Sequence, residues 1–258
     1  MAFEVTDDLL LAPVQLAIAV YDPNEQSSNN KAPGWQFLSW ESLGFDNGDY
    51  FRGSNLYSRQ LVIGDNIVDA QAIVALKDDV LSITFRGSQQ FADWVYNFTQ
   101  GVYDFSNFYS AFADLFEGVE RYLADDQIGQ HVKKVLVSGH SLGGALAELF
   151  MDRHSNSDVE FLGVTIGSPG INLLNYGGTI EPDPRLFNLW HYDDPVHDIT
   201  IGDVDQGVEL GIERPDINQL LVDYTEHLSG EYLSSVMALT ASGGFNKYWL
   251  NSTAYHVG

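Results

Sequence analysis

The sequence predicts an α/β fold in which a mainly parallel central sheet is flanked by helices, and three observations support this. Short runs rich in Val, Ile and Phe alternate with segments of helical spacing from residue 67 onward. A glycine-rich turn at 139–144 joins a short apolar run directly to a helix of small residues. The chain has 258 residues, of which 45% are hydrophobic, enough for one sizeable core. We therefore expect residues 1–258 to form a single domain.

The individual elements follow from these patterns. Two strands with a short polar turn between them are predicted at Ile67–Leu76 and Val80–Phe85. Further strands are predicted at Val132–Val137, Val159–Ile166 and Leu186–His191. Apolar spacing predicts helices at Phe112–Leu123, Leu142–Met151 and His227–Leu239. The segments Asn24–Gly34 and Gly44–Gly53 have the composition of surface loops.

The charge balance excludes some classes of function. The chain has 12 Lys and Arg against 36 Asp and Glu, a formal net charge of −24. Such a surface repels nucleic acids and anionic lipid headgroups, so we expect no DNA or RNA partner. An acidic secreted enzyme and an enzyme adapted to salt or divalent cations both fit this charge. The absence of cysteine excludes disulfides, thiolate metal sites and a cysteine nucleophile.

The apolar segments do not indicate membrane insertion. No run of about 20 uncharged apolar residues occurs, so no transmembrane segment is expected. The apolar segment Leu9–Val20 is interrupted by Pro13 and preceded by acids, whereas a secretory signal requires positive charge there. We expect a secreted protein rather than a cytoplasmic one, although no amino-terminal signal is visible.

A short segment around Ser141 carries the chemical signal of the sequence. A predicted strand leads into Gly139-His140-Ser141-Leu142-Gly143, and a predicted helix follows at once. Side chains two residues before and after such a serine would collide in a sharp turn, so both positions favour glycine. The turn also places the hydroxyl at a helix amino terminus, which favours developing negative charge. Ser141 is therefore the predicted nucleophile; a glycine-rich turn without chemistry is the alternative.

Four motifs in this order resemble the class 3 (fungal-type) lipases of the α/β-hydrolase superfamily. The motifs are Ile83–Ser88, Val137–Gly144, His191–Val196 and His227–Leu233. The resemblance extends over roughly Ile67 to Leu239. It implies an α/β-hydrolase fold with a triad of Ser, Asp and His in that chain order.

The resemblance assigns the triad acid to one of two neighbouring aspartates. In the family the acid follows a strand and directly precedes a step such as Pro-Val, and this register selects Asp194. Its role is to hold the histidine in the correct tautomer and to stabilise the imidazolium. Asp193 is then a surface acid.

The triad base must come after the acid, which leaves three histidines. His197 lies only three residues beyond Asp194, too close to reach between the acid and the serine. His227 matches the family pattern His-x-x-x-x-Tyr-Leu through Tyr232 and the leucine that follows it. We therefore expect His227 to be the base, and His256, near the end of the chain, is the alternative.

The resemblance also implies the groups that hold the oxyanion. Ser88 follows a predicted strand and should lie at the carboxyl edge of the sheet, where such folds bind ligands. The family uses this position as one oxyanion donor. The backbone N–H of Leu142, the residue after the nucleophile, is the second. A turn residue or helix N-cap is the alternative for Ser88.

A short apolar stretch after Ser88 is the candidate lid helix. Its apolar side chains share one helical face and are expected to cover the acyl pocket: Phe91, Trp94, Val95 and Phe98. In fungal-type members a helix at this position rolls aside at a lipid surface. An ordinary core helix is the alternative.

These expectations define a function. We expect a carboxylic ester hydrolase that cleaves acyl-glycerol esters, with a lipid or ester substrate met at a lipid–water interface. A phospholipase, a feruloyl-type esterase, an acyltransferase and a non-catalytic lipid-binding protein are the alternatives. No cofactor is needed, and no metal is expected because Asp203–Gly207 lacks the third acid and terminal Glu of a calcium loop. The sequence leaves the oligomeric state open.

Overall fold

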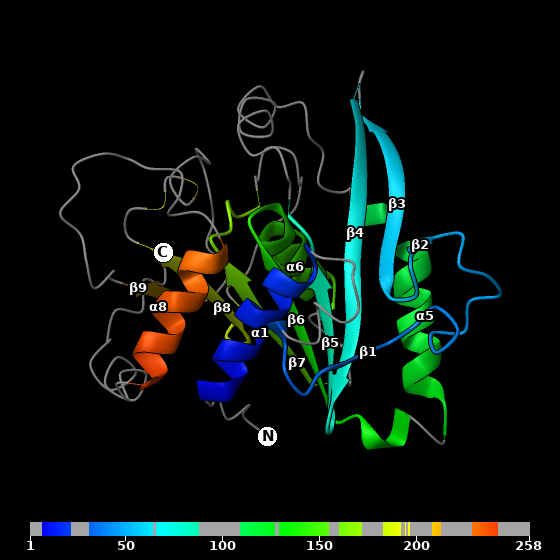
Figure 1. Ribbon diagram of the computed structural model, residues 1–258, viewed down its shortest axis with the longest axis horizontal. Coiled ribbons are helices and arrows are strands. Elements are labelled where there is room, and N and C mark those ends of the chain that lie inside the picture. Colours follow the sequence, from blue (N-terminus) through cyan, green and yellow to red (C-terminus); the bar gives the residue numbers. More distant parts are fainter. Residues whose placement is uncertain are drawn as a thin grey trace.

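The computed structural model describes most of the central part of the chain (Figure 1). The described residues are 7–21, 31–63, 66–87, 109–126, 129–154, 160–171, 183–191, 194, 196, 208–212 and 229–241. They form an α/β fold built on one mixed sheet with helices on both faces.

The sheet has nine strands, in the order β2-β3-β4-β5-β6-β7-β8-β9, with β1 paired to β4. The strands from β1 to β5 pair antiparallel, and those from β5 to β9 pair parallel. The antiparallel strands are β1 (Gln36–Phe37), β2 (Phe51–Arg52), β3 (Leu56–Ile63) and β4 (Asn66–Lys77). The parallel strands are β5 (Val80–Phe85), β6 (Lys134–His140), β7 (Glu160–Ile166), β8 (Leu186–His191) and β9 (Val208–Ile212).

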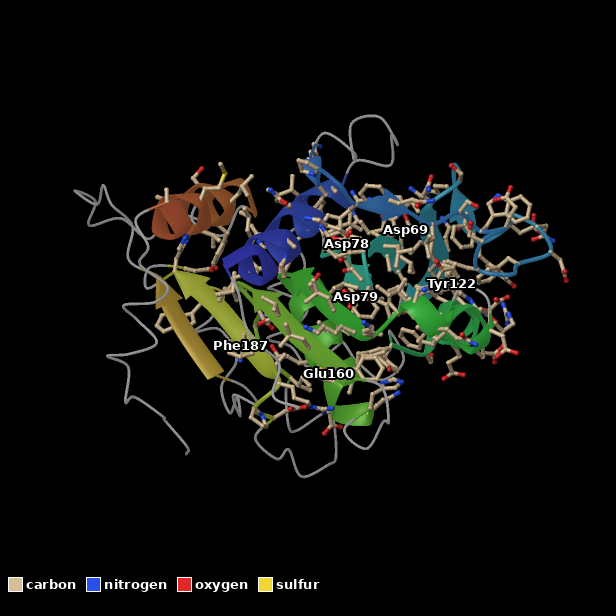
Figure 2. All side chains as sticks on the ribbon, turned by 90° about the horizontal axis from the view of Figure 1, so that it is seen from below. Asp69, Asp78, Asp79, Tyr122, Glu160 and Phe187 are labelled. Carbon is tan, nitrogen blue, oxygen red and sulfur yellow. The ribbon has the colours of Figure 1, made fainter. Side chains whose placement is uncertain are left out.

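The helices divide between the two faces of the sheet, as Figure 2 shows from below. One face carries α1 (Asp7–Ala19) and α8 (Ser229–Ala241), which contribute to a single apolar cluster with β6, β7 and β8. The other face carries α5 (Ala113–Ala124) and α6 (Leu142–Arg153), which share the second cluster. A short 3-10 helix, Gly129–His131, leads toward β6. None of the described helices is long and apolar enough to cross a bilayer.

The parallel strands bring the segments that carry the candidate site residues to one edge of the sheet. Phe85 at the end of β5 pairs in register with Gly139 near the end of β6, and Gly139 pairs with Thr165 of β7. A buried hydrogen bond of 2.9 Å joins the Thr84 and Ser138 hydroxyls across the same two strands. The carboxyl ends of these strands therefore lie side by side, where parallel α/β sheets place their ligands.

Helix α6 packs closely on the sheet because its first turns contain small residues. Gly144, Ala145 and Ala147 are all buried. On the facing strand, a Cβ built at Gly163 would lie 2.8 Å from Cγ of Met151, so the last turn of α6 also packs tightly on the sheet. Small residues on both surfaces thus let α6 lie close to the sheet.

The predicted strands and helices from residue 67 to 191 are confirmed, with boundaries shifted by three residues or fewer. The helix predicted at His227–Leu239 is observed as α8, from Ser229 to Ala241. The sequence patterns did not predict helix α1, which contains Pro13, or the strands β1, β2, β3 and β9; strand β2 lies within Gly44–Gly53, where a surface loop was expected. The helix continues through Pro13 since burying Leu10 and Leu16 against the sheet outweighs one lost backbone hydrogen bond.

Helix α1 should contribute strongly to stability through its buried leucines. Leu16 is fully buried, whereas Leu11 on the same helix is only partly buried. We expect Leu16→Ala to lower the free energy of unfolding by about 2–5 kcal/mol, as deletion of a core leucine does. Leu11→Ala, the matched control, should cost clearly less. Urea unfolding monitored by circular dichroism measures both, and equal losses would contradict the packing described here.

Candidate active site

Ser141 stands in a strained turn between β6 and α6. Its backbone has φ of 58° and ψ of −128°, outside the regions that L-residues usually adopt. Its N–H donates to the carbonyl of Ile166 on β7 at 2.9 Å, and its carbonyl accepts from the N–H of Gly144 at 2.8 Å. These bonds hold the residue in its strained conformation, a kind of strain that proteins concentrate at functional sites.

The glycines on both sides of Ser141 are required by close backbone contacts. A Cβ at Gly139 would lie 2.1 Å from the carbonyl oxygen of Gly143. A Cβ at Gly143 would lie 2.3 Å from the carbonyl oxygen of Phe85, at the end of β5. Neither approach is possible for any other residue, so the spacing Gly-x-Ser-x-Gly has the steric origin that the sequence indicated.

The Ser141 hydroxyl points into a closed environment. The residue is 2% exposed, and Oγ makes no hydrogen bond to any of the described residues. A buried hydroxyl normally has a partner, so an unpartnered one at a helix amino terminus is a functional candidate. Leu142 is the first residue of α6, and its N–H belongs to the first turn, which has no intrahelical acceptor.

The end of β5 lies against Ser141. A Cβ at Gly87 would come within 3.1 Å of the Ser141 Cβ and within 2.5 Å of the His140 carbonyl oxygen. Only glycine therefore fits at position 87, and the chain leaves β5 in direct contact with the nucleophile turn. The next residue, Ser88, lies outside the described residues.

Tyr21, just after α1, supports this contact from the other side. Its hydroxyl lies 3.4 Å from Nδ1 of His140, and it accepts a hydrogen bond from the Gly87 N–H. The Arg86 guanidinium lies over the Tyr21 ring, 5.0 Å from its centroid, and donates to the side chain of Gln71. Burial raises the pKa of Tyr21 to about 12, so the phenol is neutral near pH 7. Burial also lowers the pKa of Arg86.

Asp194 lies beyond the end of β8 and is 2% exposed. Its Oδ1 accepts from the Val196 N–H at 2.9 Å, and its own N–H donates to the His191 carbonyl at 3.0 Å. Its Oδ2 accepts from the Tyr232 hydroxyl at 2.6 Å. A buried carboxylate requires such donors, because an uncompensated charge in the interior is costly.

Tyr232 connects helix α8 to the end of β8. The hydroxyl that donates to Asp194 also accepts from the His191 N–H at 3.0 Å. Its ring stacks on the His191 ring with centroids 4.0 Å apart, and Nε2 of His191 lies 3.0 Å from the Ser235 hydroxyl on the same helix. Helix α8 is thus held against the aspartate at its first turn, a few residues after His227 in the chain.

Several predicted site residues lie outside the described residues. Ser141, Leu142 and Asp194 are described, and the first two are adjacent by sequence at the carboxyl edge of the sheet. The structure does not describe the other residues of interest: Ser88, Phe91, Trp94, Val95, Phe98, Asp193, His197, His227 and His256. The partial calcium loop at 203–207 is likewise not described. Within the described part of the chain, no group of three or more His, Asp or Glu side chains could hold a metal ion.

The sequence from β5 to just beyond β8 matches a known family. A sequence model of lipase (class 3) matches residues 82–203, which include the Ser141 turn and Asp194. This stretch of the chain resembles the class 3 lipases. A comparison with curated proteins finds no significant match to this chain.

Solved structures of fungal lipases share its fold. The lipase of Rhizopus microsporus var. chinensis matches with a TM-score of 0.54 and 19% identity, over 80% of this chain and 73% of that one. A Rhizomucor miehei lipase matches with a TM-score of 0.51 and 15% identity, over 82% and 69%. The Lip2 lipase of Yarrowia lipolytica matches with a TM-score of 0.50 and 16% identity, over 81% and 79%. At these identities the likeness establishes the fold alone.

The sequence does not indicate two of the residues that surround the candidate site. In the sequence, Tyr232 serves only to identify His227 through the pattern His-x-x-x-x-Tyr-Leu. Its place in that pattern was nevertheless a sign that Tyr232 itself makes a contact at the site. Tyr21 had no such signal, because it follows a helix that was not predicted and meets Gly87 only after folding.

Removing the Tyr232 hydroxyl should deprive two buried groups of one hydrogen bond each. We expect Tyr232→Phe to lower the free energy of unfolding by about 1–3 kcal/mol, because the Asp194 carboxylate and the His191 N–H both lose a hydrogen bond. Tyr57→Phe is the matched control, as Tyr57 is equally buried and donates to the Ala111 carbonyl.

Tyr57→Phe should lower the free energy of unfolding by less than Tyr232→Phe does. The other partner of the Tyr57 hydroxyl is Arg59, which is partly exposed and can bind water instead. Urea unfolding of the two variants side by side gives the comparison. A smaller loss for Tyr232→Phe than for Tyr57→Phe would show that the Asp194 contact contributes little.

Proposed function

We propose that this protein is a class 3 lipase, a carboxylic ester hydrolase that cleaves acyl-glycerol esters through an acyl-enzyme. The observation that carries the proposal is the Ser141 turn. A strained serine with a buried hydroxyl stands at the amino terminus of α6, between two glycines that admit no side chain. This arrangement aims a nucleophile at a site where negative charge is stabilised.

In the first half of the reaction, Ser141 Oγ attacks the ester carbonyl carbon. The base takes the hydroxyl proton, and we assign this role to His227. The tetrahedral intermediate collapses, the carbon–oxygen bond to the glycerol breaks, and the imidazolium gives its proton to the leaving alcohol. In the second half, water gives a proton to the base and attacks the acyl-enzyme. The fatty acid leaves, and the proton returns to Ser141.

The contacts of Asp194 support its assignment as the triad acid. A carboxylate that orients a histidine must be buried and held in one rotamer. The Val196 N–H and the Tyr232 hydroxyl hold both of its oxygens. Tyr232 also belongs to the helix that begins two residues after His227, so the acid and the segment bearing the base share one anchor.

We assign the role of stabilising the oxyanion to the backbone N–H groups of Leu142 and Ser88. The first lies at the start of α6, where the helix dipole adds to the hydrogen bond. The contact between Gly87 and the Ser141 Cβ supports the second, because it brings the chain to the nucleophile one residue before Ser88. One such donor contributes about 3–4 kcal/mol to lowering the barrier.

The substrate assignment rests on the family and on charge. We propose uncharged or zwitterionic lipids, because a net charge of −24 opposes the approach to anionic surfaces. The low exposure of Ser141 supports a cover that moves before an ester can enter. We assign the cover to the segment bearing Phe91, Trp94, Val95 and Phe98.

Loss of the nucleophile tests the proposal most directly. We expect Ser141→Ala to lower ester hydrolysis by about a thousandfold to a millionfold, because the acyl-enzyme cannot form. Ser82→Ala is the matched control: Ser82 is also buried, but it lies inside β5 and bonds to Thr84. Initial rates on p-nitrophenyl esters and on a triacylglycerol emulsion provide the measurement. A wild-type protein without turnover on esters of any chain length would instead favour a non-catalytic lipid-binding role.

The two candidate bases can be separated in the same assay. We expect His227→Ala to abolish turnover to a similar degree, because no other group then accepts the Ser141 proton. His256→Ala should keep at least half of the wild-type rate. The reverse pattern would transfer the role of base to His256 and leave the serine mechanism standing.

A panel of substrates decides the class of ester. Equal molar amounts of a triacylglycerol, a phosphatidylcholine and a feruloyl ester should give the highest rate on the triacylglycerol. Testing each below and above its solubility limit distinguishes a lipase, whose rate rises once aggregates form, from a plain esterase with a smooth curve. A feruloyl ester as the best substrate would contradict the acyl-glycerol assignment.

A further inference from the structure

The β3–β4 hairpin extends beyond the edge of the sheet that carries Ser141. In register, Ala72 of β4 pairs with Phe85, and Phe85 pairs with Gly139, two residues before Ser141. Residues 66–71 of β4 continue past the end of β5 while remaining paired with β3. Figure 1 shows this two-stranded ribbon rising well past the ends of its neighbours.

The size of this extension follows from the register. Ile67 lies five residues beyond Ala72, so it is about 17 Å past the end of β5, at about 3.4 Å per residue. Ser141 follows β6, two strands away, at the same edge. A surface that approaches the edge bearing the nucleophile therefore meets the outer part of the hairpin on that side.

Two exposed apolar side chains stand together near the end of this ribbon. Val62 is 76% exposed and Ile67 is 69% exposed, the two highest values among the large hydrophobic residues described. They are direct cross-strand partners, so both side chains project from one face of the ribbon as a single pair. Scattered exposed apolar residues are ordinary, but a paired set on a projecting tip resembles a contact surface.

The ribbon below this pair is braced by polar contacts on the same face. Arg86 donates to Gln71, which donates to the Ser58 hydroxyl at 3.0 Å on the opposite strand. Closer to the tip, Arg52 donates to Asp69 at 2.6 Å. Arg86 itself directly precedes Gly87, so the hairpin is fixed to the segment that contacts Ser141. The apolar pair thus keeps a defined position relative to the nucleophile.

We propose that the β3–β4 hairpin is a lipid-docking element, and that Val62 and Ile67 enter the surface of an uncharged or zwitterionic lipid aggregate. The choice of lipid as the occupant rests on the proposed function. It also follows from charge, because a chain of net charge −24 is repelled by an anionic surface and not by a neutral one. A lipid surface accepts a small apolar wedge without requiring shape complementarity.

The exposed area argues against a second copy of the chain as the occupant. Fully burying a Val or Ile removes about 60–120 Å² of apolar surface from water, so the pair offers roughly 200 Å². A stable protein–protein interface needs about 800 Å² from each partner. The apolar pair alone is far too small for a stable dimer. It is large enough to shift the partition of the protein between water and a lipid surface.

Site-specific fluorescence tests the docking directly. The chain has no cysteine, so a single introduced cysteine can be labelled with an environment-sensitive fluorophore without background. We expect Val62→Cys and Ile67→Cys to show a blue shift on phosphatidylcholine vesicles. Lys133→Cys is the control, since Lys133 is exposed and precedes β6 at the opposite edge of the sheet. It should show no shift.

A second measurement uses the unlabelled protein. We expect the double variant Val62→Thr/Ile67→Thr, which keeps β-branched side chains, to bind phosphatidylcholine vesicles about tenfold more weakly in sedimentation. Its ratio of rates on aggregated and dissolved ester should fall by a similar factor. Gln60→Thr, on the same face of the hairpin, should bind as the wild type does.

The outcomes separate this proposal from the proposed function. Unshifted probes at 62 and 67 on vesicles that bind the protein, or undiminished binding of the double variant, would overturn the docking element alone. A wild-type protein that binds no vesicles would do the same. Lipid-free dimerisation that the double variant abolishes would reassign the pair to a second copy. Vesicle binding through the hairpin without ester turnover would leave docking intact and refute the hydrolase.

Discussion

The turn at Ser141 is the constraint on which the site depends. A left-handed backbone at this residue costs free energy, and the backbone bonds to Ile166 and Gly144 keep it in place. The same turn lets the first residues of α6 approach β5, since the Gly143 position all but touches the Phe85 carbonyl. Strain, glycine spacing and close helix packing are therefore one feature of the molecule, and changing any of them disturbs the position of Ser141.

A second constraint joins the late part of the chain to the sheet. Tyr232 donates to Asp194 and accepts from His191, so a single hydroxyl links helix α8 to the end of β8. Tyr21 accepts from Gly87 and lies beside His140, whose ring also lies 6.1 Å from that of Tyr232. Two neutral phenols from distant parts of the sequence thus brace the strand ends around Ser141, where a charged group would require its own counterion.

The antiparallel half of the sheet has a different relation to the site. Strands β3 and β4 extend beyond the sheet edge that carries Ser141 and hold their apolar pair past it, while strand β5 ends near Ser141. The bracing through Arg86 and Gln71 connects the two regions. The projecting ribbon therefore keeps a defined position relative to Ser141.

The sequence alone determined the features that depend on local chemistry. The turn at Ser141, its glycines, the parallel strands from β5 to β8 and the helix after the turn follow from spacing and steric need within a few residues. Only the tertiary structure decided the partners of Asp194, the place of Tyr21 and the course of α1 through Pro13. Each of these joins residues far apart in the chain, and the burial that makes them favourable exists only once the sheet has formed.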